Sequence, residues 1–125
     1  YCEVAAANAT TFVKGNAVVD DSNGYITNAS AGGNVDVRYV VMESVLTTAA
    51  GQKVLCVRTE GVTFLADCDA AWVQTDVLTE ADLAAAGQVD PNASTDDIFA
   101  IEKGVGITAV GTQVIGQFTR AVPNS

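Results

Sequence analysis

The feature that most limits the possible folds is a repeat of the chain at a spacing of sixty residues. Shifting the sequence by sixty lays residues 35–62 over 95–122 without a gap, and eight of the 28 aligned pairs are identical. About two or three identities would be expected by chance in so alanine- and valine-rich a chain. The identical pairs are Asp36/Asp96, Val45/Val105, Thr48/Thr108, Ala49/Ala109, Gly51/Gly111, Val54/Val114, Thr59/Thr119 and Val62/Val122. The sequence therefore predicts two similar halves of about 60 residues.

The similarity extends beyond this ungapped block. The same shift places Phe12 over Trp72, whereas Asn28–Ser30 matches Asn92–Ser94 at a spacing four residues longer. An insertion confined to a loop produces such a slip. We predict repeat halves at about 12–62 and 72–122, and the alternative is a coincidence between similar strand–turn patterns.

Short apolar runs bounded by glycine recur along the chain and indicate β-strands. The segment GQKVLCVRTEGV at 51–62 holds Val54–Val57 between two glycines, and this run is too short for a helix. Asp20–Gly24 contains Asn-Gly, which readily forms a tight hairpin turn. Strands at intervals of about ten residues predict an all-β fold, a small β-barrel or sandwich built from the two halves.

Three segments depart from this strand pattern. TEADLAAAG at 79–87 predicts a short inserted helix, with Thr79 as the N-cap, Asp82 in the capping box and Gly87 at the end. Residues 1–11 carry one charge and show no clear period, so we expect an extended N-terminal arm. A single β domain is predicted for 12–122, followed by a tail at 123–125.

The composition restricts the classes of partner. The chain is 49% hydrophobic and 17% charged, which suggests that a partner or further copies cover part of its apolar surface. No run approaches the roughly 18 apolar residues of a membrane helix, so no membrane partner is expected. The net charge of −9 repels phosphate, so no nucleic-acid partner is expected either.

The sequence predicts no catalytic chemistry. Histidine, the commonest general base, is absent. Asp67 and Asp69 match only a fragment of a calcium-binding loop, and they are more simply explained as solvated acids. Glu43 and Glu60 have no spacing that favours a carboxylate pair over two surface glutamates. We therefore expect no catalytic, cofactor-binding or metal-binding residues, no cofactor, and a protein that is not an enzyme.

The three cysteines, Cys2, Cys56 and Cys68, have no metal-site spacing. Their odd number argues against a disulfide scaffold. Free, buried or half-buried thiols are the simplest interpretation. A single Cys2–Cys56 or Cys2–Cys68 bridge is the alternative, and the sequence does not choose between the two.

The order of these features resembles a known family. A strand beginning at Gly15 leads into the hairpin at Asp21–Gly24, and a valine-rich strand ends in a glutamate at Tyr39–Glu43. Ala50–Val62 follows, and its shorter echo ends at Val114–Phe118. Between residues 12 and 120 the chain resembles the small capsid cement, or head-decoration, proteins of tailed bacteriophages.

The resemblance implies a structural role. Such a protein is a compact β domain, usually a homotrimer, on the outer surface of the virion capsid. There it binds the major capsid protein and stabilises contacts between its subunits. Strand addition by the N-terminal arm, including Tyr1, Cys2, Glu3 and Val4, is the expected means of attachment. The predicted helix and the three cysteines depart from the family pattern and leave the oligomer open.

Two other functions fit the same residues. A self-assembling surface or filament module would also be apolar, acidic and without catalytic residues, but it would polymerise by itself. A carbohydrate-binding β-sandwich would gain stability from glycans or calcium.

Overall fold

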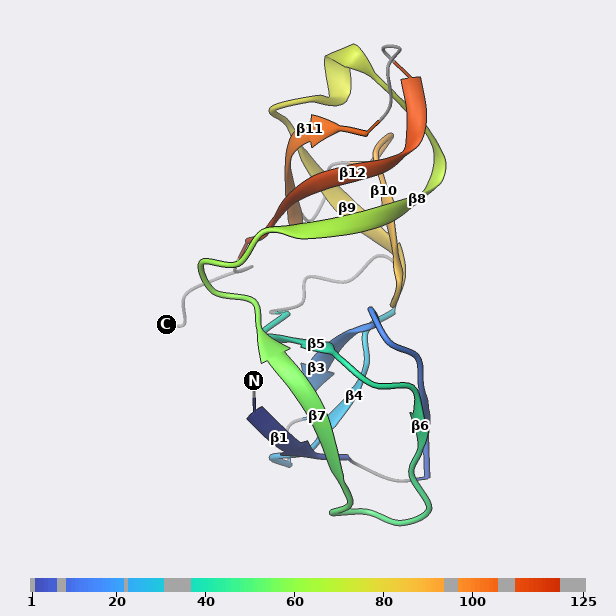
Figure 1. Ribbon diagram of the computed structural model, residues 1–125, viewed down its shortest axis with the longest axis vertical. Helices are drawn as coiled ribbons and strands as arrows, with labels where there is room; N and C mark the ends of the chain where they lie inside the picture. Colours follow the sequence, from blue (N-terminus) through green and yellow to red (C-terminus); the bar gives the residue numbers. More distant parts are fainter. Residues whose placement is uncertain are drawn as a thin grey trace.

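The computed structural model describes residues 2–6, 9–21, 23–30, 37–93, 97–105 and 110–119. Almost all regular structure in these residues is β-strand, so the predicted all-β fold is confirmed. The chain forms two units that are stacked along the long axis of the molecule (Figure 1). We call residues 2–58 the N-terminal unit and residues 64–118 the C-terminal unit.

The N-terminal unit is a five-stranded antiparallel sheet with the strand order β1-β7-β5-β3-β4. Its two edge strands are joined by a single parallel bridge between Ala6 and Ile26. A short pair, β2 and β6, lies beside this sheet. The strands are β1 (Cys2–Ala5), β2 (Thr11–Phe12), β3 (Ala17–Asp20), β4 (Ile26–Asn28), β5 (Tyr39–Val41), β6 (Val45–Leu46) and β7 (Lys53–Arg58).

The C-terminal unit is a closed five-stranded barrel with the order β10-β8-β12-β11-β9. Parallel pairing of β10 with β8 closes it, and the other pairs are antiparallel. The elements are β8 (Phe64–Val73), the 3₁₀ turn η1 (Gln74–Asp76), β9 (Glu80–Ala85), β10 (Gln88–Asp90), β11 (Phe99–Gly104) and β12 (Val110–Phe118).

The strand register is repeated between the two units. Tyr39 on β5 lies opposite Arg58 on β7, and sixty residues later Phe99 on β11 lies opposite Phe118 on β12. The next two pairs along these strands also correspond. A one-residue slip would turn every side chain to the other face of a sheet, so a shared register means that equivalent residues face the same way. The predicted similarity of the two halves is confirmed.

The outer strands also correspond, at slightly different spacings. The pairing of β1 with β7 corresponds to the pairing of β8 with β12, and the equivalent residues Cys2 on β1 and Phe64 on β8 are 62 positions apart in the sequence. The pairing of β3 with β5 likewise corresponds to the pairing of β9 with β11, and the equivalent residues Val18 on β3 and Ala81 on β9 are 63 positions apart. The parallel bridge at Ala6 has its counterpart where Cys68 pairs with β10. The repeat therefore includes strands β1 and β8, and the predicted halves at 12–62 and 72–122 began too late.

The predicted helix at 79–87 is wrong. This segment forms strand β9, which pairs with both β10 and β11, because it is the counterpart of β3. Its alanines favour a helix, but pairing and burial in the barrel override this intrinsic preference. Asp82 does not cap a helix: it is buried, and its Oδ1 accepts a hydrogen bond of 2.9 Å from the Asp97 N–H.

The predicted N-terminal arm over 1–11 is also corrected. Cys2–Ala5 form β1, which pairs with β7 so that Cys2 lies opposite Cys56 and Ala5 lies opposite Lys53. Ala6 is fully buried, and β2 follows at Thr11–Phe12. The low charge of this segment reflects a strand at the edge of the sheet rather than a free arm. Tyr1 and the predicted tail at 123–125 lie outside the described residues.

The predicted hairpin at Asp20–Gly24 is confirmed. It joins β3 to β4, and Gly24 has a φ of +87°, a conformation that glycine adopts without steric cost. The Asp21 carboxylate accepts hydrogen bonds from the backbone N–H groups of Asn23 (2.8 Å) and Tyr25 (3.2 Å). Local side-chain bonds of this kind fix the turn.

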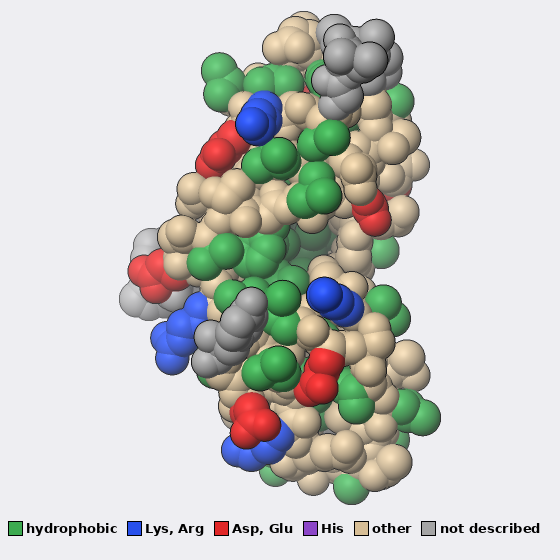
Figure 2. Space-filling model, viewed as in Figure 1, with side chains coloured by type: hydrophobic (Ala, Val, Ile, Leu, Met, Phe, Trp, Pro, Cys, Tyr) green, Lys and Arg blue, Asp and Glu red, His purple; other side chains and the backbone are tan. Residues whose placement is uncertain are grey.

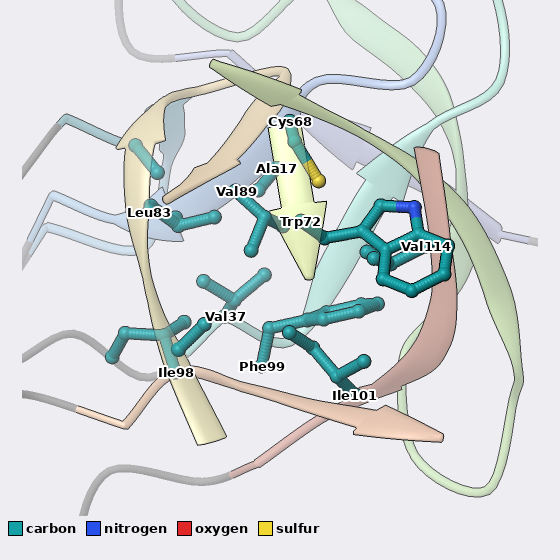
Figure 3. Close-up of a cluster of buried hydrophobic side chains, with 12 residues drawn as sticks. Ala17, Val37, Cys68, Trp72, Leu83, Val89, Ile98, Phe99, Ile101 and Val114 are labelled. Carbon is teal, nitrogen blue, oxygen red and sulfur yellow. The ribbon is translucent and has the colours of Figure 1, made fainter. Parts of the chain in front are cut away.

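Each unit has a hydrophobic core, and the larger core crosses the junction between them. Phe12 and Val54 are buried in the N-terminal cluster. In the C-terminal cluster, Trp72 and Phe99 pack with Ala17 and Val37, which come from the N-terminal unit (Figure 3). The backbone N–H of Ala17 also donates to the carbonyl of Ala86 in β9–β10 (2.6 Å). The two units are thus packed against each other.

Candidate binding site

A groove with a volume of about 420 Å³ lies at the junction of the two units. The N-terminal unit contributes the segment Val13–Asn16 and Val40, and the C-terminal unit contributes the starts of β8 and β10 and the end of β12. Figure 2 shows hydrophobic side chains gathered in the hollow between the units. We call this hollow the junction groove.

The junction groove is lined by residues from both faces of β8. Leu65 and Phe64 are neighbours on β8, so their side chains point to opposite faces. Phe64 packs edge-on against Phe118, with ring centroids 5.5 Å apart. Leu65 is 60% exposed and Val13 is 52% exposed. Two large apolar residues of the lining, Val13 and Leu65, are therefore more than half exposed.

Polar contacts hold the surroundings of the junction groove in place. The Lys14 N–H donates to Ser44 Oγ (3.0 Å), and Asn16 Nδ2 donates to Asn28 Oδ1 (3.1 Å). On the side of the groove formed by the C-terminal unit, Gln113 Nε2 on β12 donates to Asp67 Oδ1 on β8 (2.9 Å). These bonds fix the turn that carries Val13 and the strand that carries Leu65, so the groove is formed before any partner binds.

The acidic residues considered from the sequence are dispersed in the structure. Asp67 and Asp69 are exposed on β8, and Glu43 Oε2 accepts a bond from the Leu55 N–H (2.8 Å). Glu60 is exposed in the turn after β7. Among the residues that the structure describes, no three histidine, cysteine, aspartate or glutamate side chains gather as a metal site would require.

All three cysteines have free thiols, although Cys2 and Cys56 are opposite one another on β1 and β7. Cys68 belongs to the core of the C-terminal unit. Burial raises the pKa of the Cys56 thiol to about 11, and the nearby Cys2 and Glu43 add to this. The pKa of the Cys68 thiol is also raised to about 11. Burial is the largest cause, and the negative charges of Asp69 and other nearby acids add to the increase.

Thiol reactivity provides a first prediction. At pH 8 only about one in a thousand molecules of a thiol with a pKa near 11 is ionised, and the thiolate is the reactive form. We expect maleimide to label half-buried Cys2 rapidly and to reach Cys56 and Cys68 only after denaturation. Mass spectrometry of the labelled protein at successive times checks this. Rapid labelling of all three thiols in the native protein would contradict the burial described here.

The same shifts give a pH dependence of stability. Folding favours the neutral thiol at Cys56 and Cys68, because the folded pKa lies above the ordinary value of 9.0. This contribution is fully present below pH 9 and is lost as the pH rises to about 11. We expect the unfolding free energy to fall across that interval.

No family model, curated protein or solved structure matches this chain. Within the described residues, there is no helix with the length and apolar character needed to cross a bilayer.

The sequence did not reveal the junction groove. Its lining comes from positions as distant as Val13, Leu65 and Phe118, which no local motif connects. The only available signal was the apolar excess of the whole composition, which indicates covered surface without locating it.

Proposed function

We propose that this protein is a capsid cement protein: it binds the outer surface of a phage head as a homo-oligomer, a trimer, and stabilises contacts between major capsid protein subunits. The proposal rests on the resemblance of residues 12–120 to that family and on the apolar surface at the junction of the units. The observation that carries it is the preformed junction groove, with Val13 and Leu65 more than half exposed.

The junction groove is suited to binding a protein segment. Its lining combines the apolar residues Val13, Leu65, Phe64 and Phe118 with the exposed polar residues Lys14, Asp67 and Gln88. Burying an apolar side chain of this size contributes about 1.5–3 kcal/mol. Little of that gain is lost to ordering, because both walls are fixed before binding. An extended apolar segment of the capsid subunit is the proposed occupant.

This proposal changes the expected mode of attachment. Cys2, Glu3 and Val4 are paired with β7, so they would have to leave their own sheet to add to a capsid strand as a free arm. The junction groove requires no such rearrangement. The charge of −9 is consistent with a position outside the shell, away from packaged DNA.

The groove variant Leu65→Asp provides the second prediction. Placing a carboxylate at this apolar position should weaken binding to expanded, undecorated heads about tenfold or more, since burial of a leucine contributes at least 1.4 kcal/mol or so. Co-sedimentation of purified protein with heads measures this. The substitution is at an exposed side chain, so the thermal unfolding temperature should change little.

Leu46→Asp is the matched control. Leu46 is 62% exposed, as Leu65 is, but it lies on β6 and does not line the junction groove. Its variant should bind heads as the wild type does. Equal binding by the Leu65 and Leu46 variants would exclude the groove as the attachment site, and no binding by the wild type would refute the proposed function.

A further inference from the structure

The N-terminal unit has a second cavity, which is the counterpart of part of the junction groove. This cavity has a volume of about 190 Å³, and we call it the N-terminal mouth. Its described lining comes entirely from the N-terminal unit and includes Val4, Val18, Tyr25, Ile26 and Tyr39. The junction groove, in contrast, is lined by both units.

The repeat relates part of the lining of the two cavities. At the spacing of 63 residues, Gly24–Ile26 in the N-terminal mouth correspond to Gly87–Val89 in the junction groove. At the spacing of 62, Val4 corresponds to Ala66, which also lines the groove. The two cavities are therefore equivalent openings of equivalent units.

Within the chain, the opening of the C-terminal unit is covered by the turn at Val13–Asn16 of the N-terminal unit. The Ala17 N–H beside this turn donates to the carbonyl of Ala86 (2.6 Å). Asn16 Oδ1 lies so close to Gly87 that a Cβ there would be 3.1 Å away. This contact between units shows how such an opening is covered.

The C-terminal unit has its own version of the covering turn, at Asp76–Thr79. The bond from the Asn16 N–H to the Val13 carbonyl (2.9 Å) is matched by the bond from Thr79 to Asp76 (3.2 Å). The same spacing of 63 residues relates Gly15 to Leu78. Both donate their N–H to the neighbouring strand, at 2.8 Å and 2.9 Å. We call Asp76–Thr79 the C-terminal tip.

Leu78 is an unusual residue for this position. Gly15 has a φ of +98°, and Leu78 has a φ of +68°, which a residue with a Cβ adopts only with strain. Leu78 is also 84% exposed, more than any other large apolar side chain of the described residues. Both features are unfavourable in an isolated molecule, and burial against a partner would offset the second.

We propose that the C-terminal tip of one molecule docks in the N-terminal mouth of a second copy of this chain, with Leu78 against the mouth's apolar lining. The contact between copies reproduces the contact between the two units of a single chain. The tip carries Asp76 and is followed by Glu80. The mouth carries both signs of charge, because Arg38 and Asp20 line it and Arg58 and Glu60 lie beside Arg38, so the proposal rests on the apolar contact and on the equivalence of the two units.

Such a contact is heterologous, because the tip and the mouth are different surfaces. Copies joined in this way close into a ring when the rotation between them permits, and otherwise form a filament. A three-membered ring would account for the proposed trimer. The inference does not depend on capsid attachment, since the purified chain alone is sufficient to test it.

Leu78→Gly separates association from folding. Glycine relieves the positive φ, so the thermal unfolding temperature of the dissociated protein should rise or remain unchanged. Self-association should weaken about tenfold or more, because the docked side chain is removed. Sedimentation velocity over a concentration series measures the association, and Leu46→Asp should associate as the wild type does. A monomeric wild type, or undiminished association of Leu78→Gly, would overturn the proposal.

Cross-linking tests the pairing of surfaces. Two variants are made in a Cys2→Ser background. Thr79→Cys introduces one exposed thiol at the tip, and Asn23→Cys introduces one exposed thiol beside the mouth. These positions are equivalent to Asn16 and Ala86, which lie at the contact within the chain. A short bis-maleimide should link the two variants only when they are mixed. Linkage of either variant to itself at the same yield would refute head-to-tail docking.

Discussion

Removal of residues 1–6 is expected to unfold the N-terminal unit. The deletion removes the whole of β1, whose four residues pair with β7, together with the fully buried Ala6 and its bridge to Ile26. Val54 and Cys56 on β7, which are completely buried, would then face an open edge. We expect a loss of several kcal/mol, about half or more of the 5–15 kcal/mol that stabilises a typical domain.

Thermal unfolding followed by circular dichroism measures this effect. The deletion should lower the midpoint by tens of degrees or remove the cooperative transition. Glu3→Ala is the matched control, since Glu3 is exposed on the same strand and its loss leaves the backbone pairing intact. Such a surface change typically costs less than about 0.5 kcal/mol. An unchanged midpoint after deletion would contradict this account and would support the free N-terminal arm that the sequence predicted.

Gly116→Ala should have the second-largest effect. A Cβ at Gly116 would lie 2.0 Å from the backbone oxygen of Ala100 and 2.8 Å from Phe99 Cε2. The first obstacle is backbone of the paired strand β11, so relief requires β11 and β12 to separate. We expect a loss of about 3 kcal/mol or more, at the upper end of overpacking costs.

Gly87→Ala is the control for this glycine variant. The nearest atom to its added Cβ would be Asn16 Oδ1 at 3.1 Å, a side-chain atom at a longer distance than the backbone oxygen that faces Gly116. A small change in stability, well below that of Gly116→Ala, is expected in urea unfolding. Equal effects of the two substitutions would show that the close approach of β11 to β12 is not as tight as described.

The sequence was informative where the repeat has no gap. Strands β5 and β7 match β11 and β12 at a constant spacing of sixty, so their shared register could be anticipated. β1 and β3 match their counterparts at spacings of 62 and 63, so a single shift of sixty misaligned them. The predicted helix at 79–87 and the predicted arm at 1–11 both fell in these misaligned parts.

Substitutions within the repeat show why side-chain packing was harder to foresee. Phe12 and Trp72 are both buried, as their alignment suggested. The larger indole requires space, and a Cβ at Gly104 would lie 1.9 Å from Trp72 Cζ2. The N-terminal counterpart of Gly104 is Ser44. The first half thus has Phe12 and Ser44 where the second half has Trp72 and Gly104. This pair of changes can be recognised as coupled only when Trp72 and Gly104 are known to be in contact.

Neither candidate interaction surface could be read from a motif. The junction groove depends on how the units are stacked, and the N-terminal mouth is identified only by comparison with it. Leu78 gave no signal in the sequence, because its significance lies in a backbone conformation that its counterpart Gly15 adopts freely. Tertiary arrangement therefore supplied what local patterns could not.

The central claim is that one five-stranded unit occurs twice in this chain with the same hydrogen bonds. Amide hydrogen exchange, measured by NMR, tests it most directly. Three pairs of equivalent amides donate to equivalent backbone carbonyls: Gly15 and Leu78, Val41 and Ile101, and Thr59 and Thr119. We expect all six to exchange far more slowly than free-chain amides. Protection of one member of each pair, with free-chain exchange of the other, would contradict the claim.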